Sequence, residues 1–452
     1  MESINPTNGQ LIKEYKAYTE AQVSKIIGLT YSSYKEWRLV PGAEKSALMK
    51  NAAAELRKNK KELARLITME MGKIIRESEA EIEKCAWVCD YYADNAGRFL
   101  QDEFIASDAG KSFVSFEPLG IILAVMPWNF PFWQVFRFAA PALIAGNAGL
   151  LKHASNVSGC ALAIESIFKS AGFPDHLFSS LLIPSKMVEP VIAHRYVRAV
   201  TLTGSEGAGS AVASAAGKYL KKSVLELGGS DPYIVLDDAD LNSCVKVSAQ
   251  ARMLNAGQSC IAAKRFIVVR NRLKEFERMQ TDIISKMKIG DPLSESTDIG
   301  PLARPEFVAE IDWQIKQSVK MGARLLCGGS KIDGDGSFYQ ATVLSDVRAG
   351  MPVYREETFG PVSVIIPVKN EEEAIAVAND SEFGLGGSLW TRDIKHGEEI
   401  ARRIESGSVF INGMTKSDPR LPFGGIKKSG YGRELSHYGL KEFVNIKTIW
   451  IK

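Results

Sequence analysis

Short apolar segments alternate with helix-like segments along most of this sequence, and this alternation constrains the fold more than any other feature. A strand buried in a parallel sheet needs a continuous apolar run, and its crossover to the next parallel strand usually contains a helix. Helical spacing of apolar residues is clear in Glu306–Met321. The sequence therefore predicts an α/β fold with parallel sheets. The predicted strands are Ile121–Val125, Gly149–Lys152, Val197–Thr203, Ser223–Leu227, Tyr233–Leu236, Phe266–Arg270, Ser363–Val368 and Ser408–Ile411.

The predicted strands form two sets, before and after about residue 228. A chain of 452 residues is long enough for two or three domains, so we expect two doubly wound parallel-sheet domains. The glycines of Leu225–Gly229 (LELGG) allow a sharp turn between them. The first hundred residues show helical periodicity, with Gly72 as a helix end. At the other end, Phe443–Ile451 alternates as a strand does, and we expect it to join another sheet.

Composition and charge exclude several classes of partner. With 56 basic and 53 acidic residues, the net charge of +3 gives no reason to expect a nucleic-acid or membrane surface. The six cysteines show no metal-ligand spacing and are too sparse for a disulfide scaffold. The first ten residues, MESINPTNGQ, lack the charged and apolar regions of a signal peptide. We therefore expect a cytoplasmic protein with reduced thiols and no metal site.

Cys260 stands among small residues in the segment NAGQSCIAAKR, residues 255 to 265. A structural cysteine normally packs as a small hydrophobe, whereas these neighbours leave space for a substrate to approach the sulfur. A thiolate is a good nucleophile once its pKa is lowered. The segment therefore indicates a catalytic nucleophile, and the alternative is an inert packing cysteine.

Two other residues fit the chemistry of a nucleophilic thiol. Glu226 ends an apolar strand, where burial would raise its pKa toward the range of a general base. Asn129 lies between two prolines in MPWNFP, and such rigid framing suits a hydrogen-bond donor to an oxyanion. The alternatives are a hydrogen-bonded core glutamate and an asparagine that only forms its own turn.

The segment Leu202–Gly209 (LTGSEGAG) follows an apolar strand and opens an alanine-rich helix. Glycines at such a turn let backbone N–H groups approach a phosphate, and the helix dipole favours the anion. A second glycine- and lysine-containing stretch, AGKS at 109–112, lacks the upstream glycine of a phosphate loop and is excluded. A thiol, a base, an amide donor and a phosphate turn together indicate thioester chemistry coupled to a nucleotide cofactor.

The sequence resembles the NAD(P)-dependent aldehyde dehydrogenase superfamily along its whole length. The resemblance is carried, in order, by MPWNFP, LLKHAS, LTGSEGAG, LELGG, GQSC, EETFGP and LPFGGIKKSGYGRE. It implies a Rossmann-like cofactor domain, a catalytic domain and a β arm that forms a homodimer or homotetramer. The implied limits are 1–98 and 119–227 for the cofactor domain, 228–432 for the catalytic domain, and 99–118 with 433–452 for the arm.

The resemblance also implies residue roles. Cys260 attacks the aldehyde, Asn129 and the Cys260 backbone N–H hold the oxyanion, and a hydride passes to the nicotinamide to leave a thioester. Glu226 activates the water that releases the acid. The residues implied to bind the cofactor are Trp128, Lys152, Gly204, Ser205, Gly209, Leu227, Glu357 and Phe359.

Ser155 departs from a common pattern of the family, in which a glutamate three residues after the lysine binds both ribose hydroxyls. A carboxylate at this position repels a 2′-phosphate, whereas a serine hydroxyl donates a hydrogen bond to it. Ser155 therefore favours NADP⁺ as the cofactor, with NAD⁺ as the alternative.

Within the superfamily the sequence is most similar to the shorter succinate-semialdehyde dehydrogenases. That resemblance implies that Arg137 and Ser417 bind the distal carboxylate of the substrate, with Trp133 and Phe132 beside the methylenes. A guanidinium holds a carboxylate with paired hydrogen bonds, which supports this assignment. The alternative for Arg137 is a structural ion pair.

Other functions stay open on the sequence alone. The enzyme alternatives are a dehydrogenase for glutarate semialdehyde, lactaldehyde or a broad range of aliphatic aldehydes. Cys260 and Glu226 could also support thiol esterase activity without a cofactor, although LTGSEGAG and EETFGP would then have no use. A silent binding member of the fold is disfavoured because Cys260, Glu226 and Asn129 are all present.

Overall fold

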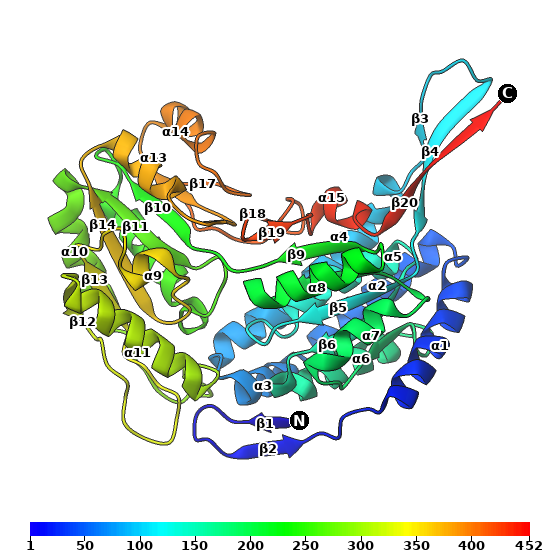
Figure 1. Ribbon diagram of the computed structural model, residues 1–452, viewed down its shortest axis with the longest axis horizontal. Coiled ribbons are helices and arrows are strands. Elements are labelled where there is room, and N and C mark those ends of the chain that lie inside the picture. The colour runs from blue at the N-terminus through cyan, green and yellow to red at the C-terminus, as the bar shows by residue number, and fades with distance from the viewer.

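The structure is a computed structural model that describes residues 1–452. Two large sheets dominate it, and both are mostly parallel (Figure 1). The α/β fold with two parallel-sheet units is therefore as predicted. No helix combines the length and the apolar character needed to cross a membrane.

The first sheet has six strands in the order β19-β9-β8-β5-β6-β7. Its central strands are buried apolar runs linked by helices: α5 packs on β5 and β6, and α8 packs on β8 and β9. All neighbouring pairs are parallel except β19–β9. Residues 430–431 lie within the expected catalytic domain but belong to this sheet. The strand bounds are β5 Ile121–Met126, β6 Ala148–His153, β7 Phe178–Ser180, β8 Val197–Thr203, β9 Lys222–Glu226 and β19 Gly430–Tyr431.

Helices cover the first sheet, and the predicted helical character of the first hundred residues is confirmed for most of them. Gly72 follows α3 with a left-handed backbone (φ 83°), the conformation that glycine adopts at helix ends. A small hairpin, β1 Glu2–Ile4 and β2 Leu11–Glu14, precedes the helices and was not predicted. The helices are α1 Glu20–Trp37, α2 Gly42–Lys58, α3 Lys60–Met71, α4 Ile75–Phe99, α5 Trp133–Ile144, α6 Ser158–Ser170, α7 Val188–Ala193 and α8 Glu206–Lys218.

The second sheet has seven strands in the order β12-β13-β14-β11-β10-β16-β17, with β12 antiparallel to its neighbour. A separate large apolar core fills this half of the molecule. The strands are β10 Asp231–Val235, β11 Ala263–Val269, β12 Arg324–Cys327, β13 Thr342–Ser345, β14 Val362–Val368, β16 Ser388–Trp390 and β17 Phe410–Ile411. The helices are α9 Leu241–Met253, α10 Arg270–Ile284, α11 Pro305–Lys320, α12 Pro352–Arg355, α13 Glu371–Asn379 and α14 Ile394–Ala401.

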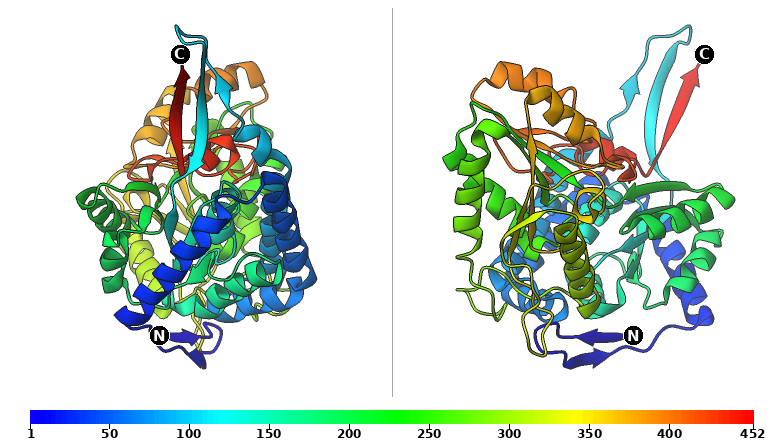
Figure 2. Two further views of the ribbon diagram at one scale, coloured as in Figure 1. Left: turned by 90° about the vertical axis from the view of Figure 1, so that its right-hand side faces the viewer. Right: turned by 60° about the vertical axis from the view of Figure 1, so that its left-hand side comes forward.

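A third, three-stranded sheet projects from the body of the protein (Figures 1 and 2). Its strands are β3 Glu103–Phe104, β4 Lys111–Pro118 and β20 Val444–Ile451. β20 pairs antiparallel with β4 from Val444–Pro118 to Ile451–Lys111, so the predicted C-terminal strand joins a distant part of the chain. Shorter elements complete the fold: η1 Ser155–Val157, η2 Ser185–Met187, η3 Leu254–Gly257, β15 Phe383–Gly384, β18 Ile426–Lys427 and α15 Ser436–Lys441.

Candidate active site

A cavity of about 690 Å³ lies between the two large sheets. The first sheet contributes the turns that follow the carboxyl ends of β5, β8 and β9, where open α/β sheets bind their ligands. The second sheet contributes the loops that precede β11 and β14. The lining residues are Pro127, Trp128, Asn129, Gln134, Thr203, Gly204, Ser205, Glu206, Gly207, Leu227, Gly228, Cys260, Phe307, Glu310, Arg355, Glu356, Glu357, Phe359, Glu382 and Phe383.

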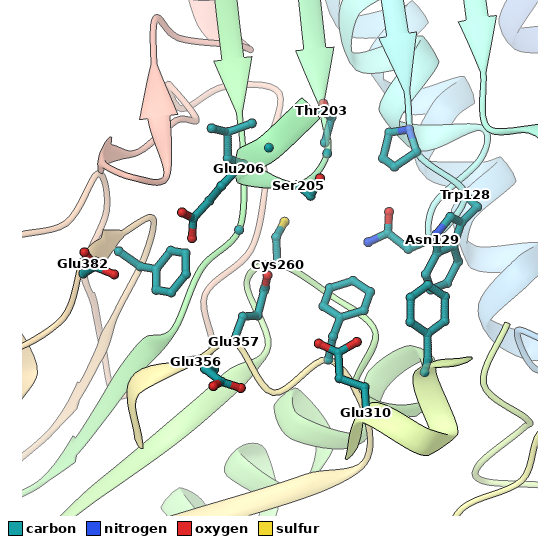
Figure 3. A pocket seen from close by; sticks show the side chains of 18 of the residues that line it. Trp128, Asn129, Thr203, Ser205, Glu206, Cys260, Glu310, Glu356, Glu357 and Glu382 are labelled. Carbon is teal, nitrogen blue, oxygen red and sulfur yellow. The ribbon is translucent and has the colours of Figure 1, made fainter. Parts of the chain in front are cut away.

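Cys260 lies in the loop between η3 and β11, and its sulfur points into the cavity (Figure 3). The loop is sharply turned, because Asn255, Ala256 and Gly257 all have a left-handed backbone. A Cβ on Gly257 would overlap the carbonyl oxygen of Gly360, so glycine is required there. A Cβ on Gly229 would lie 2.5 Å from the Cys260 carbonyl oxygen. Close backbone contacts thus fix the position of the loop that carries the sulfur.

Burial raises the pKa of the Cys260 thiol to about 12, so without a ligand it is protonated near neutral pH. The cations of Arg137 and Lys264 act in the opposite direction and favour the thiolate. Glu357 and Glu226 raise the thiol pKa further. Attack by the sulfur therefore requires a group that removes its proton.

Asn129 follows β5 and its amide points into the same cavity as the Cys260 sulfur (Figure 3). Asn129 Nδ2 donates to the carbonyl of Gln258 at 3.1 Å, and its backbone carbonyl accepts from Asn255 Nδ2 at 2.8 Å. These bonds link the Asn129 turn to the Cys260 loop. The second N–H of the Asn129 amide is free to donate to an oxyanion.

Glu226 ends β9 and is 2% exposed, and neither of its carboxylate oxygens has a hydrogen-bond partner. Burial and the nearby Glu434 raise its pKa well above the usual range, while Arg137 and Arg433 oppose the shift. The side chain does not line the cavity, and Gly424 lies against it: a Cβ there would be 2.8 Å from Glu226 Oε1. The structure thus places a carboxyl with a raised pKa behind the cavity wall.

Arg137 on α5 is buried and forms an ion pair with Glu434, which follows β19. Its Nη2 also lies 3.3 Å from Thr203 Oγ1, and its guanidinium stacks over the ring of Phe423 at 4.6 Å. The structural ion pair that the sequence left open is therefore present. Arg137 does not line the cavity in this structure.

Trp133 and Ser417 meet behind the Asn129 turn. Trp133 Nε1 donates to Ser417 Oγ at 3.1 Å, and both residues are buried. The start of α5 is anchored because Glu81 accepts the backbone N–H groups of Phe132 and Trp133 at 2.9 and 3.0 Å. Phe132 and Trp133, both expected beside the substrate, lie in the apolar core, and neither lines the cavity.

The opposite side of the cavity fits a dinucleotide. Ser205 caps α8 by accepting from the Ala208 N–H, and the other N–H groups at the start of the helix have no partner within it, so they can donate to a phosphate. Gly209 lets α8 approach β9, because a Cβ there would lie 2.6 Å from Leu227 Cδ2. A Cβ on Gly228 would lie 2.6 Å from Glu357 Oε2, so glycine keeps this part of the cavity open.

Aromatic rings and one carboxylate form the wall near Cys260. The ring of Trp128 stacks on Phe307 at 5.0 Å and meets Phe359 edge-on at 5.8 Å. Glu357 Oε1 accepts from the Gly229 N–H at 3.1 Å and from Lys264 Nζ at 2.8 Å. A carboxylate held in this way can accept hydrogen bonds from ribose hydroxyls.

Lys152 and Ser155 lie beyond the cavity lining, at the carboxyl end of β6 and in η1. Burial lowers the pKa of Lys152, and the positive charge of Arg304 lowers it further. Arg304 donates to Asn156 Oδ1 at 3.0 Å, and no carboxylate pairs with either cation. This corner is suited to an anion.

A comparison with known protein families identifies the family of this chain. The sequence profile described as the aldehyde dehydrogenase family matches residues 1–449. This protein belongs to the aldehyde dehydrogenase family. Among its relatives, a protein of Synechocystis named probable succinate-semialdehyde dehydrogenase [NADP(+)] is 53% identical over 99% of both chains. A succinate-semialdehyde dehydrogenase [NADP(+)] of Mycobacterium avium is 46% identical over 99% of this chain and 96% of its own.

A solved aldehyde dehydrogenase structure agrees in fold as well as sequence. The succinic semialdehyde dehydrogenase from Streptococcus pyogenes, determined with NADP⁺, is 40% identical. It superposes with a TM-score of 0.98 over 100% of this chain and 99% of that one. The fold expected from the sequence resemblance, that of an aldehyde dehydrogenase, is thereby confirmed.

Several residues that shape this aldehyde dehydrogenase site escaped the sequence analysis. Glu77 and Glu81 on α4 could have been noticed, because they fall on the otherwise apolar face of an amphipathic helix. Lys264 is a charge within a fully buried strand, which is a similar signal. Glu434 and Arg304 gave no signal, since their partners are distant in sequence. The cavity residues that lie outside the seven segments of the family resemblance are Gln134, Phe307, Glu310, Arg355, Glu382 and Phe383.

Proposed function

We propose that this aldehyde dehydrogenase oxidises succinate semialdehyde to succinate with NADP⁺. One observation carries the proposal: the Cys260 sulfur, the Asn129 amide, the Glu357 carboxylate and the glycine-containing turn before α8 all line one cavity. The relatives named succinate-semialdehyde dehydrogenase support the substrate.

In the proposed reaction the Cys260 thiol passes its proton to solvent water, and its sulfur bonds to the aldehyde carbon while the C=O π electrons move onto the oxygen. The N–H groups of Asn129 Nδ2 and Cys260 stabilise the resulting oxyanion. Bound NADP⁺ supplies the acceptor for the hydride that leaves this carbon. Glu226, whose pKa is raised by burial, then takes a proton from the water that attacks the thioester. Since Glu226 lies behind the cavity wall, we expect its side chain to turn toward Cys260 for this step.

The cofactor proposal rests on the corner formed by Lys152, Arg304 and Ser155. Two cations without carboxylate partners favour a 2′-phosphate, and the Ser155 hydroxyl adds a hydrogen bond. The relatives whose names specify NADP(+) support the same preference. NAD⁺ lacks that phosphate, so we expect it to bind more weakly.

The substrate proposal places the distal carboxylate near Ser417, Trp133 and Arg137. One observation favours a second candidate, a dehydrogenase for uncharged aliphatic aldehydes: the Arg137 guanidinium is already paired with Glu434. Other semialdehydes, such as glutarate semialdehyde, remain alternatives within the first candidate.

The proposed assembly is a homodimer or homotetramer formed through β3, β4 and β20. Phe104, Ile446 and Trp450 on this arm are at least half exposed, as expected for a surface that another copy covers. We propose the domain limits 1–98 with 119–227, 228–432, and 99–118 with 433–452. We also propose a cytoplasmic location, because all six cysteines are unpaired.

Steady-state kinetics with succinate semialdehyde and butanal, each with NADP⁺ and NAD⁺, test the proposal. We expect kcat/KM for succinate semialdehyde to exceed that for butanal by at least about 10-fold, the value of one charge-assisted hydrogen bond. Equal values for the two aldehydes would establish the broad aliphatic candidate instead. A preference for NAD⁺ would overturn the cofactor proposal alone.

A further inference from the structure

We infer that Lys84 determines substrate specificity by binding the distal carboxylate together with Ser417. This inference rests on the proposed function. Lys84 Nζ donates to Ser417 Oγ at 2.8 Å and lies 4.1 Å from the centre of the Trp133 ring. Trp133 Nε1 donates to the same hydroxyl oxygen at 3.1 Å. We refer to Lys84, Ser417 and Trp133 as the lysine–serine cluster.

The helix that carries Lys84 holds the aldehyde side of the site together. On α4, Glu77 accepts the backbone N–H of Asn255 in the Cys260 loop at 2.8 Å. One turn later, Glu81 accepts the first N–H groups of α5. Lys84 follows three residues after Glu81 on the same side of the helix. The same helix therefore contacts the Cys260 loop through Glu77, the start of α5 through Glu81 and Ser417 through Lys84.

The hydrogen bonding of the lysine–serine cluster is incomplete in a way that suits a carboxylate. Ser417 Oγ accepts two hydrogen bonds, so its own O–H is free to donate. An ammonium has three N–H donors, and Lys84 uses one of them. A carboxylate placed here would accept from the hydroxyl and from the remaining donors of Lys84.

The charges around Lys84 also favour a carboxylate as the ligand. Two buried cations near the cluster are already neutralised, since Lys73 pairs with Glu81 and Arg137 pairs with Glu434. The exposed Arg420 pairs with Asp418. Lys84 pairs with no carboxylate, although it packs against a buried tryptophan. A half-buried charge such as that of Lys84 lacks full compensation without a counter-ion, and a ligand can supply one. The carboxylate of a semialdehyde supplies it, whereas an uncharged aldehyde does not.

The ionisation of Lys84 adds a pH signature. Burial lowers its pKa to about 8; the Arg137 cation from α5 adds to this, and Cys85 and Glu81 on α4 and Asp418 beside Ser417 oppose it. Lys84 therefore loses its charge as the pH rises through about 8. We expect KM for succinate semialdehyde to rise over this range, while KM for butanal does not follow it.

Three variants of the full-length enzyme test the inference: Lys84→Met, Lys84→Arg and, as a matched control, Lys45→Met. Like Lys84, Lys45 lies over a tryptophan ring, at 5.6 Å from that of Trp37, and has no carboxylate partner; it is the more buried of the two lysines. Lys84→Met should raise KM for succinate semialdehyde about 10- to 100-fold and leave butanal oxidation unchanged. Lys84→Arg should retain most of the preference for succinate semialdehyde, and Lys45→Met should retain all of it.

Two further readouts separate binding from chemistry. Succinate should bind the wild-type enzyme in calorimetry at neutral pH and bind at least about 10-fold more weakly to Lys84→Met. In Lys84→Arg, which keeps its charge, the rise of KM above about pH 8 should disappear. If Lys84→Met does not fold, this pH comparison between Lys84→Arg and the wild type decides the question.

The results that would contradict this inference differ from those that would contradict the proposed function. A wild-type enzyme that oxidises both aldehydes equally well would remove the proposed substrate. If the wild type prefers succinate semialdehyde but Lys84→Met keeps that preference, or loses both activities equally, Lys84 does not read the carboxylate. An unchanged pH profile in Lys84→Arg overturns the inference in the same way.

Discussion

Lys264 Nζ lies 2.8 Å from Glu357 Oε1 and so joins the Cys260 loop to the loop that precedes β14. Lys264 is 1% exposed, and its ammonium also donates to the carbonyl oxygens of Ser259 and Cys260 at 3.0 and 2.8 Å. One buried cation thus positions both the nucleophile and the carboxylate expected at the nicotinamide ribose.

Replacing Lys264 by methionine should weaken cofactor binding. Glu357 would lose its charged partner, so we expect KM for NADP⁺ to rise about 10-fold and the free energy of unfolding to fall by about 2 kcal/mol. Cofactor titration and thermal unfolding measure the two effects. Lys286→Met, which removes an exposed ion pair with Asp282, is the control and should change neither quantity appreciably. Unaltered NADP⁺ binding in Lys264→Met would show that the ion pair with Lys264 is not required to position Glu357 for the cofactor.

Replacing Glu434 by glutamine should change the pH dependence of thioester hydrolysis. The negative charge of Glu434 raises the pKa of Glu226, and a base accepts a proton only in its deprotonated form. Without that charge the pKa of Glu226 falls, so the acid limb of the rate profile should move to lower pH.

Hydrolysis of an activated ester at a series of pH values measures this shift. Glu70→Gln is the matched control, because burial also raises the pKa of Glu70, whose carboxylate accepts from Ser3, Gly159 and Cys160. It should lower stability without moving the profile. A Glu434→Gln profile that stays in place, or moves to higher pH, would contradict the electrostatic coupling of the two carboxyls.

A glutamate in place of Ser155 should move cofactor preference from NADP⁺ toward NAD⁺. The new carboxylate would repel the 2′-phosphate and could accept from both hydroxyls of an NAD⁺ ribose. We expect kcat/KM for NADP⁺ to fall at least about 10-fold, with a smaller change or a gain for NAD⁺. Ser170→Glu, at the exposed end of α6, adds the same charge elsewhere and should leave the ratio unchanged. Equal losses with both cofactors would place Ser155 away from the phosphate.

Long apolar strands were predictable from the sequence, whereas short ones were not. The predicted and observed bounds of β8 coincide at Val197–Thr203, because four of its seven residues are the strand-forming valine or threonine and all but Arg198 are buried. β16, Ser388–Trp390, is too short to show any period, and its place in the sheet comes from pairing with β10. The β1–β2 hairpin was not predicted, because β2 is exposed along its whole length and so shows no apolar pattern.

The candidate site was predictable where one segment carries the signal. Cys260 and Asn129 stand in distinctive local sequences, and both face the cavity. The partners of buried charges were not predictable, because Arg137–Glu434, Lys264–Glu357 and Lys84–Ser417 join residues far apart in the chain. Such pairs arise only when packing excludes water from both groups.

The position of Arg137 has a consequence for redesign. Its one guanidinium lowers the pKa of both the Cys260 thiol and the Glu226 carboxyl, and it neutralises Glu434. Any exchange at Arg137 intended to admit a new aldehyde would also disturb the nucleophile and the base, so selectivity and turnover would change together. Lys84 is not a main cause of either of those two pKa shifts, which makes it the better starting point for engineering a different substrate range.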